Sequence, residues 1–387
     1  MDPIIAATHA DPYPYPYPYP YYATLRAEGG LTFHHGLKLW IASSARAVCA
    51  VLAHADCRVR PVQEPVPNAI AEGTAGKVFG LLMRMNDGER QRCPRSAVEP
   101  ELERIDVDAV NALVAARLIS ADAHGLYKAM FRGPVCVVAA LLGFTPAQGR
   151  AISELTAEFV ACLSPLSNDL QLAAAHAAAE QLRGCFIELL AEPESALLRG
   201  IRKRFTGDEE TLIANLIGLC SQTHEATAGL IGHALIALQR QPSLRDASMD
   251  ALLAEVQRFD PSVQNTRRFA AQSCEIDGVR VEAGDVILVL LASANRDPLL
   301  NEQPDRFLLE RPNRRSFSFG SGRHQCPGQS LAMSIAAATV NQILANDIDL
   351  TQLTWRYRPS LNGRIPSFSI SSASGCDAVA DGQHLPG

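Results

Sequence analysis

The sequence predicts a mainly α-helical protein with a small β-rich region. Five stretches place apolar residues at intervals of three and four, as an amphipathic or buried helix does. These stretches are 109–118, 127–142, 151–163, 170–190 and 212–238. The segment 274–289 alternates around Asp277-Gly278, a turn signal that predicts a small hairpin. Helices therefore dominate, and the strands are expected in a minor region beside them.

The length of 387 residues suggests two or three domains, but one large α-rich unit is also ordinary, and we expect a single soluble domain over residues 1–387. Hydrophobic residues make up 47% of the chain, enough for a large core. The net charge of −6 argues against nucleic acid as a partner, because nucleic-acid binding needs a basic surface. We find no apolar run long enough to cross a membrane and no basic-then-apolar leader. A cytoplasmic location without a membrane partner is expected.

The ten cysteines are scattered singly along the chain. None forms a C-x-x-C pair or another short spacing typical of zinc sites or disulfide frameworks. Most of them are expected to be small apolar core residues.

Both ends of the chain are expected to lie outside the core. Residues 11–22 repeat Pro-Tyr, which favours an extended arm over about 1–22. This arm is either a recognition tail or an ordinary chain start with a duplicated repeat. Residues 376–387 are expected to form a flexible tail.

Short elements follow the arm. We expect a helix that ends at Gly29, a strand at 37–41 and a helix capped by the serine at 43 or 44. Frequent proline and glycine predict a long loop over 61–80.

The segment 317–328 holds the most distinctive cysteine. Gly320 and Gly322 permit a tight turn, and Cys326 follows them directly before a helical run. Backbone N–H groups and the positive end of that helix would converge on the sulfur and favour its thiolate. A thiolate is a nucleophile or a metal ligand, and haem iron is one metal that accepts it.

This segment resembles the haem-ligand signature of the cytochromes P450, Phe-Gly-x-Gly-x-His-x-Cys-x-Gly. The fixed positions are matched by Phe319, Gly320, Gly322, His324, Cys326 and Gly328. The resemblance runs from about residue 11 to 370 and implies the P450 fold, haem b as cofactor and Cys326 as the metal ligand. Contacts to the haem are implied for Phe319, Gly320, His324 and Gly328. On the cysteine alone, a buried thiol after a glycine-rich turn would be the favoured interpretation.

A second match lies in the helix expected near 85–95. Gln91 and Arg95 stand four residues apart, so one helix face can direct both toward a buried anion. In the family the equivalent pair contacts a haem propionate, and Asp87 matches the first residue of the family segment. Pro94 departs from the pattern and would bend the helix. The alternative is a solvated basic face.

Polar residues interrupt the centre of the run 212–238. Burial of unpaired polar groups in a core costs free energy, so these residues need a reason to be there. In the P450 family this helix crosses the oxygen-binding face of the haem and carries an acid followed by threonine. Glu225 aligns with the acid, but Ala226 replaces the threonine. Gln222 and Thr223 replace the two small residues that normally precede the acid and leave room for oxygen. The resemblance therefore places Gln222 in the substrate pocket.

The hydroxyl missing at Ala226 normally helps to deliver protons for O–O cleavage, a general-acid task. Thr223 lies three residues before Ala226 and therefore on the same helix face. Thr227 is turned away by about 100°. We expect Thr223 to supply the hydroxyl, with water or a substrate hydroxyl completing the relay. Alternatively, Thr223 only bonds to a carbonyl of its own helix.

Glu255 and Arg258 match the family pair Glu-x-x-Arg, and a similar Pro-x-Val-Gln and an arginine follow them. The resemblance implies that Glu255 and Arg258 brace the core and that Arg268 meets a propionate. It also implies that Val263 faces the substrate. The apolar tip at Phe368 is expected to touch the substrate as well.

The resemblance implies oxidation of a small organic molecule by O2, in the setting of specialised-metabolite biosynthesis. Ferredoxin and ferredoxin reductase, or similar partners, would supply the electrons. Four arginines near the cysteine segment are either solvated charges or a basic docking face for the ferredoxin: Arg311, Arg314, Arg315 and Arg323. Ala226 leaves two alternatives open, a peroxide-driven or oxidative-coupling enzyme and a non-catalytic haem protein that senses ligands. The substrate itself cannot be read from the sequence.

Overall fold

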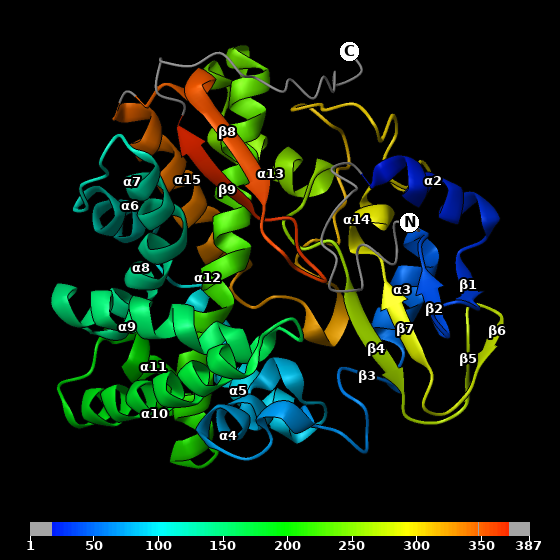
Figure 1. Cartoon of the computed structure of the whole chain (residues 1–387), viewed down its shortest axis with the longest axis horizontal. Coiled ribbons are helices and arrows are strands. Elements are labelled where there is room, and N and C mark those ends of the chain that lie inside the picture. The colour runs from blue at the N-terminus through cyan, green and yellow to red at the C-terminus, as the bar shows by residue number, and fades with distance from the viewer. Residues whose placement is uncertain (1–17, 347, 371–387) are drawn as a thin grey trace.

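The computed structural model describes residues 18–346 and 348–370. Figure 1 shows a larger helical part and a smaller part built around a sheet, which confirms the mainly α prediction. Of the predicted arm, residues 1–17 lie outside the described residues, and Tyr19 onward already belongs to helix α2 (Tyr19–Glu28). The predicted tail at 376–387 also lies outside them. As expected, α2 ends at Gly29.

The helices of the larger part follow one another with short connections from residue 74 to residue 259, and the last of them begins only after the strands at 266–289 and the cysteine segment. They are α4 (Thr74–Leu81), α5 (Glu89–Leu102), α6 (Val107–Ala115), α7 (Ala123–Tyr127), α8 (Gly133–Leu142), α9 (Pro146–Phe159), α10 (Asp169–Ala191), α11 (Ala196–Arg204), α12 (Glu209–Arg240), α13 (Met249–Phe259) and α15 (Gln329–Ala345). Single turns connect or extend them: η1 (Asn68–Ile70), η2 (Met83–Met85), η3 (Lys128–Arg132), η4 (Val160–Leu163), η5 (Pro242–Asp246), η6 (Gly322–His324) and η7 (Leu350–Gln352). All five helical stretches expected from periodicity are present.

Helix α12 organises the helical part. Asp208 caps its start by accepting a hydrogen bond from Thr211 N at 2.7 Å. Most of its residues are buried, and it packs against α4, α8, α10, α13 and α15. Figure 1 shows α12 running through the middle of the molecule. The helix therefore carries its polar centre into the interior.

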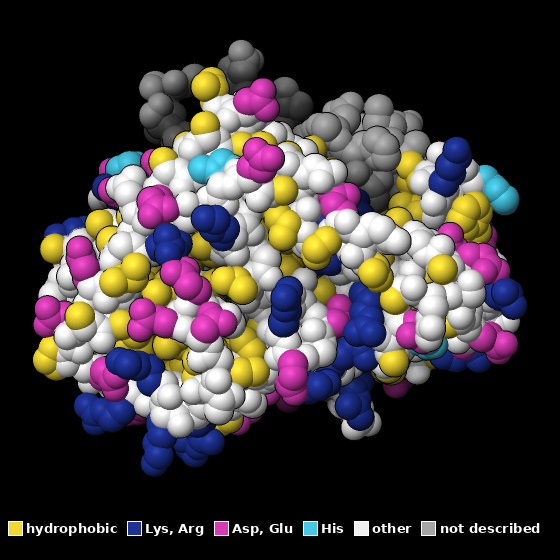
Figure 2. Space-filling view, turned by 90° about the horizontal axis from the view of Figure 1, so that it is seen from below, with side chains coloured by type: hydrophobic (Ala, Val, Ile, Leu, Met, Phe, Trp, Pro, Cys, Tyr) yellow, Lys and Arg dark blue, Asp and Glu magenta, His cyan; other side chains and the backbone are white. Residues whose placement is uncertain are grey.

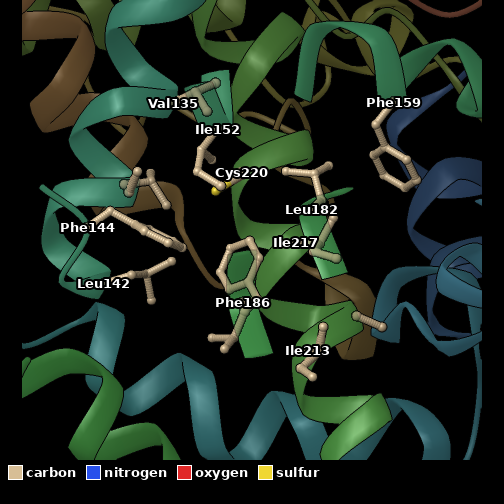
Figure 3. Packing of buried hydrophobic residues seen from close by; sticks show 14 of the residues in the cluster. Val135, Leu142, Phe144, Ile152, Phe159, Leu182, Phe186, Ile213, Ile217 and Cys220 are labelled. Atoms are coloured by element: carbon tan, nitrogen blue, oxygen red, sulfur yellow. The ribbon is translucent and has the colours of Figure 1, made fainter. Parts of the chain in front are cut away.

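Two hydrophobic clusters hold α12, one toward each end. In the first cluster, Ile213, Ile217 and Cys220 of α12 pack among side chains of α8, α9 and α10. Figure 3 shows them beside Phe144 and Phe186, whose rings meet edge-on with centroids 5.1 Å apart. The second cluster joins the segment of α12 from residue 228 onward to α13 and α15. Burial of one such side chain stabilises the fold by about 1.5–3 kcal/mol. The polar stretch 221–227 lies between the two clusters.

Helix α4 corrects the predicted loop over 61–80. Val78 and Phe79 form part of a buried face of this helix. A Cβ on Gly76 would lie 1.9 Å from the carbonyl oxygen of Ile70. This glycine therefore allows a close approach of the preceding turn and does not mark a loop.

A five-stranded sheet forms the centre of the smaller part. Its strands, in spatial order, are β1 (Leu31–His34), β2 (Leu39–Ala42), β7 (Val286–Val289), β4 (Thr266–Ala270) and β3 (Cys57–Arg58). Strands β2 and β7 pair in parallel, and β4 pairs with β7 in antiparallel register, with Arg268 opposite Ile287. Helices α3 (Ala45–Ala53) and α14 (Leu291–Asn295) lie beside the sheet. Ser44 caps α3 by accepting from Ala47 N at 3.2 Å, as expected.

Two antiparallel pairs complete the strands. Asp277 and Gly278, with φ of 53° and 79°, connect β5 (Cys274–Ile276) and β6 (Val279–Val281), which confirms the predicted turn. The end of the segment 274–289 does not extend this hairpin, because β7 joins the larger sheet instead. Strands β8 (Leu353–Tyr357) and β9 (Pro366–Ile370) form the other pair.

The stretch Ala123–Leu142, formed by α7, η3 and α8, is long and apolar enough to cross a membrane by composition alone. This departs from the expectation that no such stretch is present. Within the fold, 67% of its most apolar window is buried. Such burial is typical of a core helix, which is apolar because it packs against other helices.

Candidate functional site

The cysteine segment forms a closed loop. Gly320 and Gly322 both adopt the left-handed region, with φ of 73° and 68°, which other residues rarely enter. Cys326 N then donates to Phe319 O at 2.7 Å and closes the turn. Helix α15 begins at Gln329. The loop therefore presents Cys326 just before a helix N-terminus, as predicted.

The surroundings of Cys326 suit a metal ligand better than a free nucleophile. Burial raises the pKa of this thiol, whereas the N–H of Gly328 and the guanidinium groups of Arg84 and Arg95 act in the opposite direction. A free thiol at this place stays protonated at neutral pH. A bound metal ion supplies the positive charge that stabilises the thiolate.

Helix α5 places Gln91 and Arg95 against the cysteine loop. Gln91 Nε2 donates to Arg323 O at 2.7 Å, and Arg95 Nη1 donates to Gln325 O. Arg95 also forms an ion pair with Glu99, one turn later in the same helix. The predicted i, i+4 pair therefore points at the loop, and Pro94 is accommodated inside α5.

His324 meets the start of α5 from the loop side. Its Nε2 lies 2.9 Å from Asp87 Oδ1, and Asp87 also accepts from Val59 N at 3.1 Å. The side chains of Gln91, Arg95 and His324 thus gather on one side of the loop.

We infer a hollow between the polar centre of α12 and the cysteine loop from side chains that are both solvent-accessible and surrounded by protein. Arg84, in η2, donates to Gln222 of α12, and its charge also acts on Cys326. The Arg84 side chain is exposed, yet burial lowers its pKa. Glu225 shows the same combination, because 43% of its side chain is exposed and burial nevertheless raises its pKa. Side chains that are both accessible and surrounded by protein line an internal space.

The predicted hydroxyl of Thr223 is engaged within its own helix. Its Oγ1 donates to Leu219 O at 2.7 Å, so only its lone pairs remain as acceptors in this arrangement. The carbonyl of Ala226 accepts a hydrogen bond from Ser262 Oγ at 2.9 Å. The sequence did not predict this hydroxyl beside Ala226. Thr227 is buried, with 2% exposure.

Comparison with known proteins decides the family. The family model described as Cytochrome P450 matches residues 234–346, which include Cys326. Cytochrome P450 monooxygenase PikC of Streptomyces venezuelae is 27% identical over 92% of this chain and 89% of its own length. This chain belongs to the cytochrome P450 family.

Other relatives match a smaller share of their length. The biotin biosynthesis cytochrome P450 of Bacillus subtilis is 29% identical over 58% of this chain, and the chain spans 60% of that relative. The vitamin D(3) 25-hydroxylase of Pseudonocardia autotrophica is 30% identical over 65% of this chain and 64% of its own length.

Solved P450 structures share the fold. P450BioI, in complex with an acyl carrier protein that carries hexadec-9Z-enoic acid, has a TM-score of 0.77 at 23% identity. That match covers 92% of this chain and 98% of the other. Epothilone B-bound P450epoK has a TM-score of 0.76 at 21% identity and covers 91% and 95%.

Arg268 tests whether this P450 fits its family's haem. This side chain is 6% exposed and donates only to Thr266 Oγ1 at 3.3 Å and Arg267 O at 2.8 Å. It forms no ion pair with a carboxylate within residues 18–346 and 348–370, and burial lowers its pKa to about 10. A buried cation without a counter-charge is costly. Its setting fits an anionic group such as a haem propionate.

Glu255 and Arg258 form the core of an ionic network, as the resemblance implies. Both side chains are fully buried, with Arg258 Nη2 2.7 Å from Glu255 Oε1. Arg311 and Arg314 reach the same carboxylate at 3.2 and 3.0 Å. The interpretation of Arg311 as a solvated or docking charge is therefore wrong, because it is 7% exposed and paired inside the protein.

Two predicted substrate contacts lie on separate elements. Val263 is half-buried and forms a β-bridge with Gly363. Phe368 is half-buried on β9, with its ring centroid 6.3 Å from that of Trp355. Contact of either side chain with a substrate stays a prediction.

Arg84 is the principal residue that sequence reasoning missed. It stands within an apolar stretch, Leu-Leu-Met-Arg-Met, at 81–85. An isolated arginine among apolar residues is a usable signal, since burying an unpaired charge needs a compensating reason.

Proposed function

We propose that this P450 is a haem-thiolate monooxygenase that oxidises a small organic molecule with O2. The observation that carries the proposal is Cys326, presented on a closed loop toward a hollow whose far wall is the polar centre of α12. PikC is named a monooxygenase, and the Pseudonocardia relative is named a hydroxylase. Their names support the same reaction type.

The chain's own residues would hold haem b in this hollow. Cys326 would ligate the haem iron, and the N–H of Gly328 would stabilise its thiolate. Arg268 would neutralise one propionate, and Gln91, Arg95 and His324 would bind the other, while Phe319 and Gly320 would contact the haem. When bound, haem supplies the activation of oxygen.

Glu225 is the proton-handling residue of the proposal. Burial raises its pKa, so that its carboxyl keeps a proton to a higher pH than an exposed glutamate does. Arg358 Nη2, 3.9 Å from Glu225 Oε1, opposes this shift and orients the carboxylate when it is ionised. Thr223 and Ser262 lie within one turn of Ala226 along or beside α12 and provide hydroxyl groups for the relay. Gln222, Val263 and Phe368 would contact the substrate.

The cellular setting is part of the proposal. Electrons would come from ferredoxin and ferredoxin reductase, and the setting would be specialised-metabolite biosynthesis in the cytoplasm. Figure 2 shows Lys and Arg interspersed with Asp and Glu on the face that it presents. Together with the net charge of −6, this mixture gives no support to nucleic acid as a partner.

The test is the spectrum of the reduced carbonyl complex. The wild-type protein should bind haem and show the strongly red-shifted absorption that sulfur ligation produces. Cys326→Ser should lose this absorption, whereas Cys49→Ser, at an exposed position, should keep it. Wild-type protein without haem uptake, or an unshifted carbonyl spectrum, would refute the proposal.

Ala226 favours a second candidate, a peroxide-driven or oxidative-coupling enzyme. No hydroxyl stands at residue 226, and the hydroxyl of Thr223 is donated to Leu219 O. Turnover with NADPH, ferredoxin and its reductase should be compared with turnover with hydrogen peroxide. Faster peroxide turnover would favour this candidate. Absence of substrate-dependent oxygen consumption with the redox partners, together with absence of product with peroxide, would instead favour a ligand-sensing haem protein.

A further inference from the structure

Arg84, like Arg268, differs from the enclosed arginines that pair with a carboxylate. Arg258 pairs with Glu255, Arg364 with Asp260 and Arg296 with Asp305. Over the part of the chain that the structure describes, Arg84 forms no ion pair with a carboxylate. Its hydrogen-bond partner is the amide of Gln222, which is neutral. An amide oxygen orients a guanidinium but leaves its charge uncompensated.

The backbone on both sides of Arg84 is fixed. Asn215 of α12 accepts from Met83 N at 2.8 Å and donates to Leu81 O at 3.0 Å. Asn86 Nδ2 donates to Gly80 O at 2.8 Å and to Leu82 O at 2.9 Å. These bonds hold η2 against α12 before any ligand arrives. The guanidinium is therefore preorganised, which lowers the entropy cost of binding.

Arg84 bonds to a different element from the side chains assigned to the haem carboxylates, although its charge also acts on Arg268. Gln91 and Arg95 bond to the backbone of the cysteine loop, and Arg268 lies on β4. Arg84 instead reaches Gln222, on the wall of the hollow opposite the loop. Gln222 is one helical turn before Ala226, in the part of α12 where the substrate is expected.

We propose that Arg84, positioned by Gln222, binds a carboxylate of the substrate inside the hollow. The planar guanidinium matches a carboxylate through two parallel N–H···O bonds, and the carboxylate supplies the missing counter-charge. The substrate class is then an organic acid in its anionic form. This inference rests on the proposed function, since it names the class of molecule that the same site oxidises.

The test uses probes that do not depend on the shape of an unknown substrate. The holoenzyme is titrated with ω-(imidazol-1-yl)alkanoates of two to ten methylenes and with the matching amides. The azole anchors each probe on the haem iron and reports binding through the optical spectrum, while the chain length varies the reach of the carboxylate. At one or more lengths, the acid should bind about tenfold or more tightly than its amide, because a charge-assisted pair is worth about 1.5–3 kcal/mol.

Two variants should abolish this preference by different routes. Arg84→Gln removes the cation, and Gln222→Glu gives Arg84 a carboxylate of the protein's own. In both, the ratio of acid to amide affinity should fall to about one, while Arg84→Lys should retain part of it. Arg46→Gln, in which an exposed arginine outside the hollow is changed, should keep the wild-type ratio.

The outcomes separate this inference from the proposed function. The inference would be overturned if, at all chain lengths, the acid bound no more tightly than its amide. It would also be overturned if Arg84→Gln kept the preference for the acid over the amide. Loss of haem from Arg84→Gln, with the other variants loaded normally, would also overturn it and assign Arg84 to a propionate. If the wild-type protein took up no haem, the proposed function itself would fail.

Discussion

Glu255 and Arg268 show two ways in which this chain handles a buried charge. Glu255 is fully buried and is shared by Arg258, Arg311 and Arg314. Arg268 is nearly as deeply buried, but among the residues that the structure describes it bonds only to a neighbouring hydroxyl and a carbonyl. A charge left without its partner inside a protein costs several kcal/mol. The first arrangement completes a scaffold, and the second is completed only by a bound anion.

Arg268→Gln should therefore have opposite effects with and without haem. In the haem-free protein, removal of the uncompensated cation should leave the melting temperature unchanged or raise it. Haem affinity should fall about tenfold or more, because a propionate loses a charge-assisted partner. Thermal melting of the haem-free protein and haem titration monitor the two effects. A variant that loses stability without haem and binds haem normally would show that Arg268 is structural.

Thr223→Val should reduce coupling, the amount of product formed per O2 consumed, by about half or more. The hydroxyl of Thr223 would accept or pass a proton in a general-acid step, and valine has the same shape without that group. Oxygen electrode and product analysis measure the ratio. Thr223→Ser, which keeps the hydroxyl, should restore it. Equal coupling in the valine variant and the wild type would remove Thr223 from the relay.

At the scale of elements, glycines in two helices differ in whether packing requires them. In α4, a Cβ on Gly76 would meet the carbonyl oxygen of Ile70 at 1.9 Å. In α10, a Cβ on Gly184 would meet nothing within 4 Å. The first glycine permits packing, whereas the second only lowers helix propensity.

These two glycines make a matched pair of substitutions. Gly76→Ala should destabilise the protein by about 1–3 kcal/mol through overpacking. Gly184→Ala should stabilise it by up to about 1 kcal/mol through helix propensity. Denaturant unfolding of both variants measures the difference. A Gly76→Ala protein as stable as Gly184→Ala would contradict the close approach of α4 and η1.

Sequence reasoning reached the parts of the site that are local in the chain. The cysteine loop was predictable because its fixed residues are adjacent, and Gln91 and Arg95 because one helical turn joins them. Arg84 was not predicted as a site residue because its role depends on contact with Gln222, which is far away in sequence. Helix α4 was not predicted because composition does not distinguish a glycine that allows close packing from a glycine in a loop. The pairing of strand β7 was not predicted because tertiary contacts, and not the nearby turn, determine its partners β2 and β4.

For the whole molecule, α12 makes stability depend on pH. His224 and His233 are 1% and 3% exposed, and burial lowers the pKa of each to about 4. Both pKa values lie below the ordinary value near 6.5, so the unfolded chain binds protons first as the pH falls. The stability from the neutral histidines is present above pH 6.5 and is lost toward pH 4.

Acidification from pH 7.5 to 5 should therefore lower the free energy of unfolding by about 2 kcal/mol for each histidine. His224→Phe, whose new ring would lie beside Phe131, should remove one such contribution. Urea unfolding at both pH values measures the change. The same pH dependence in the variant as in the wild type would contradict a neutral, buried His224.

The order of strands in the five-stranded sheet has a consequence for biosynthesis. Strand β2 leaves the ribosome early, but its parallel partner β7 is made only after all of α4 to α13. Until then one edge of β2 has no partner, and β4, which carries Arg268, can pair only with the two-residue strand β3. Nascent chains released before residue 286 should therefore retain no haem, because the prosthetic group can be captured only near the end of translation.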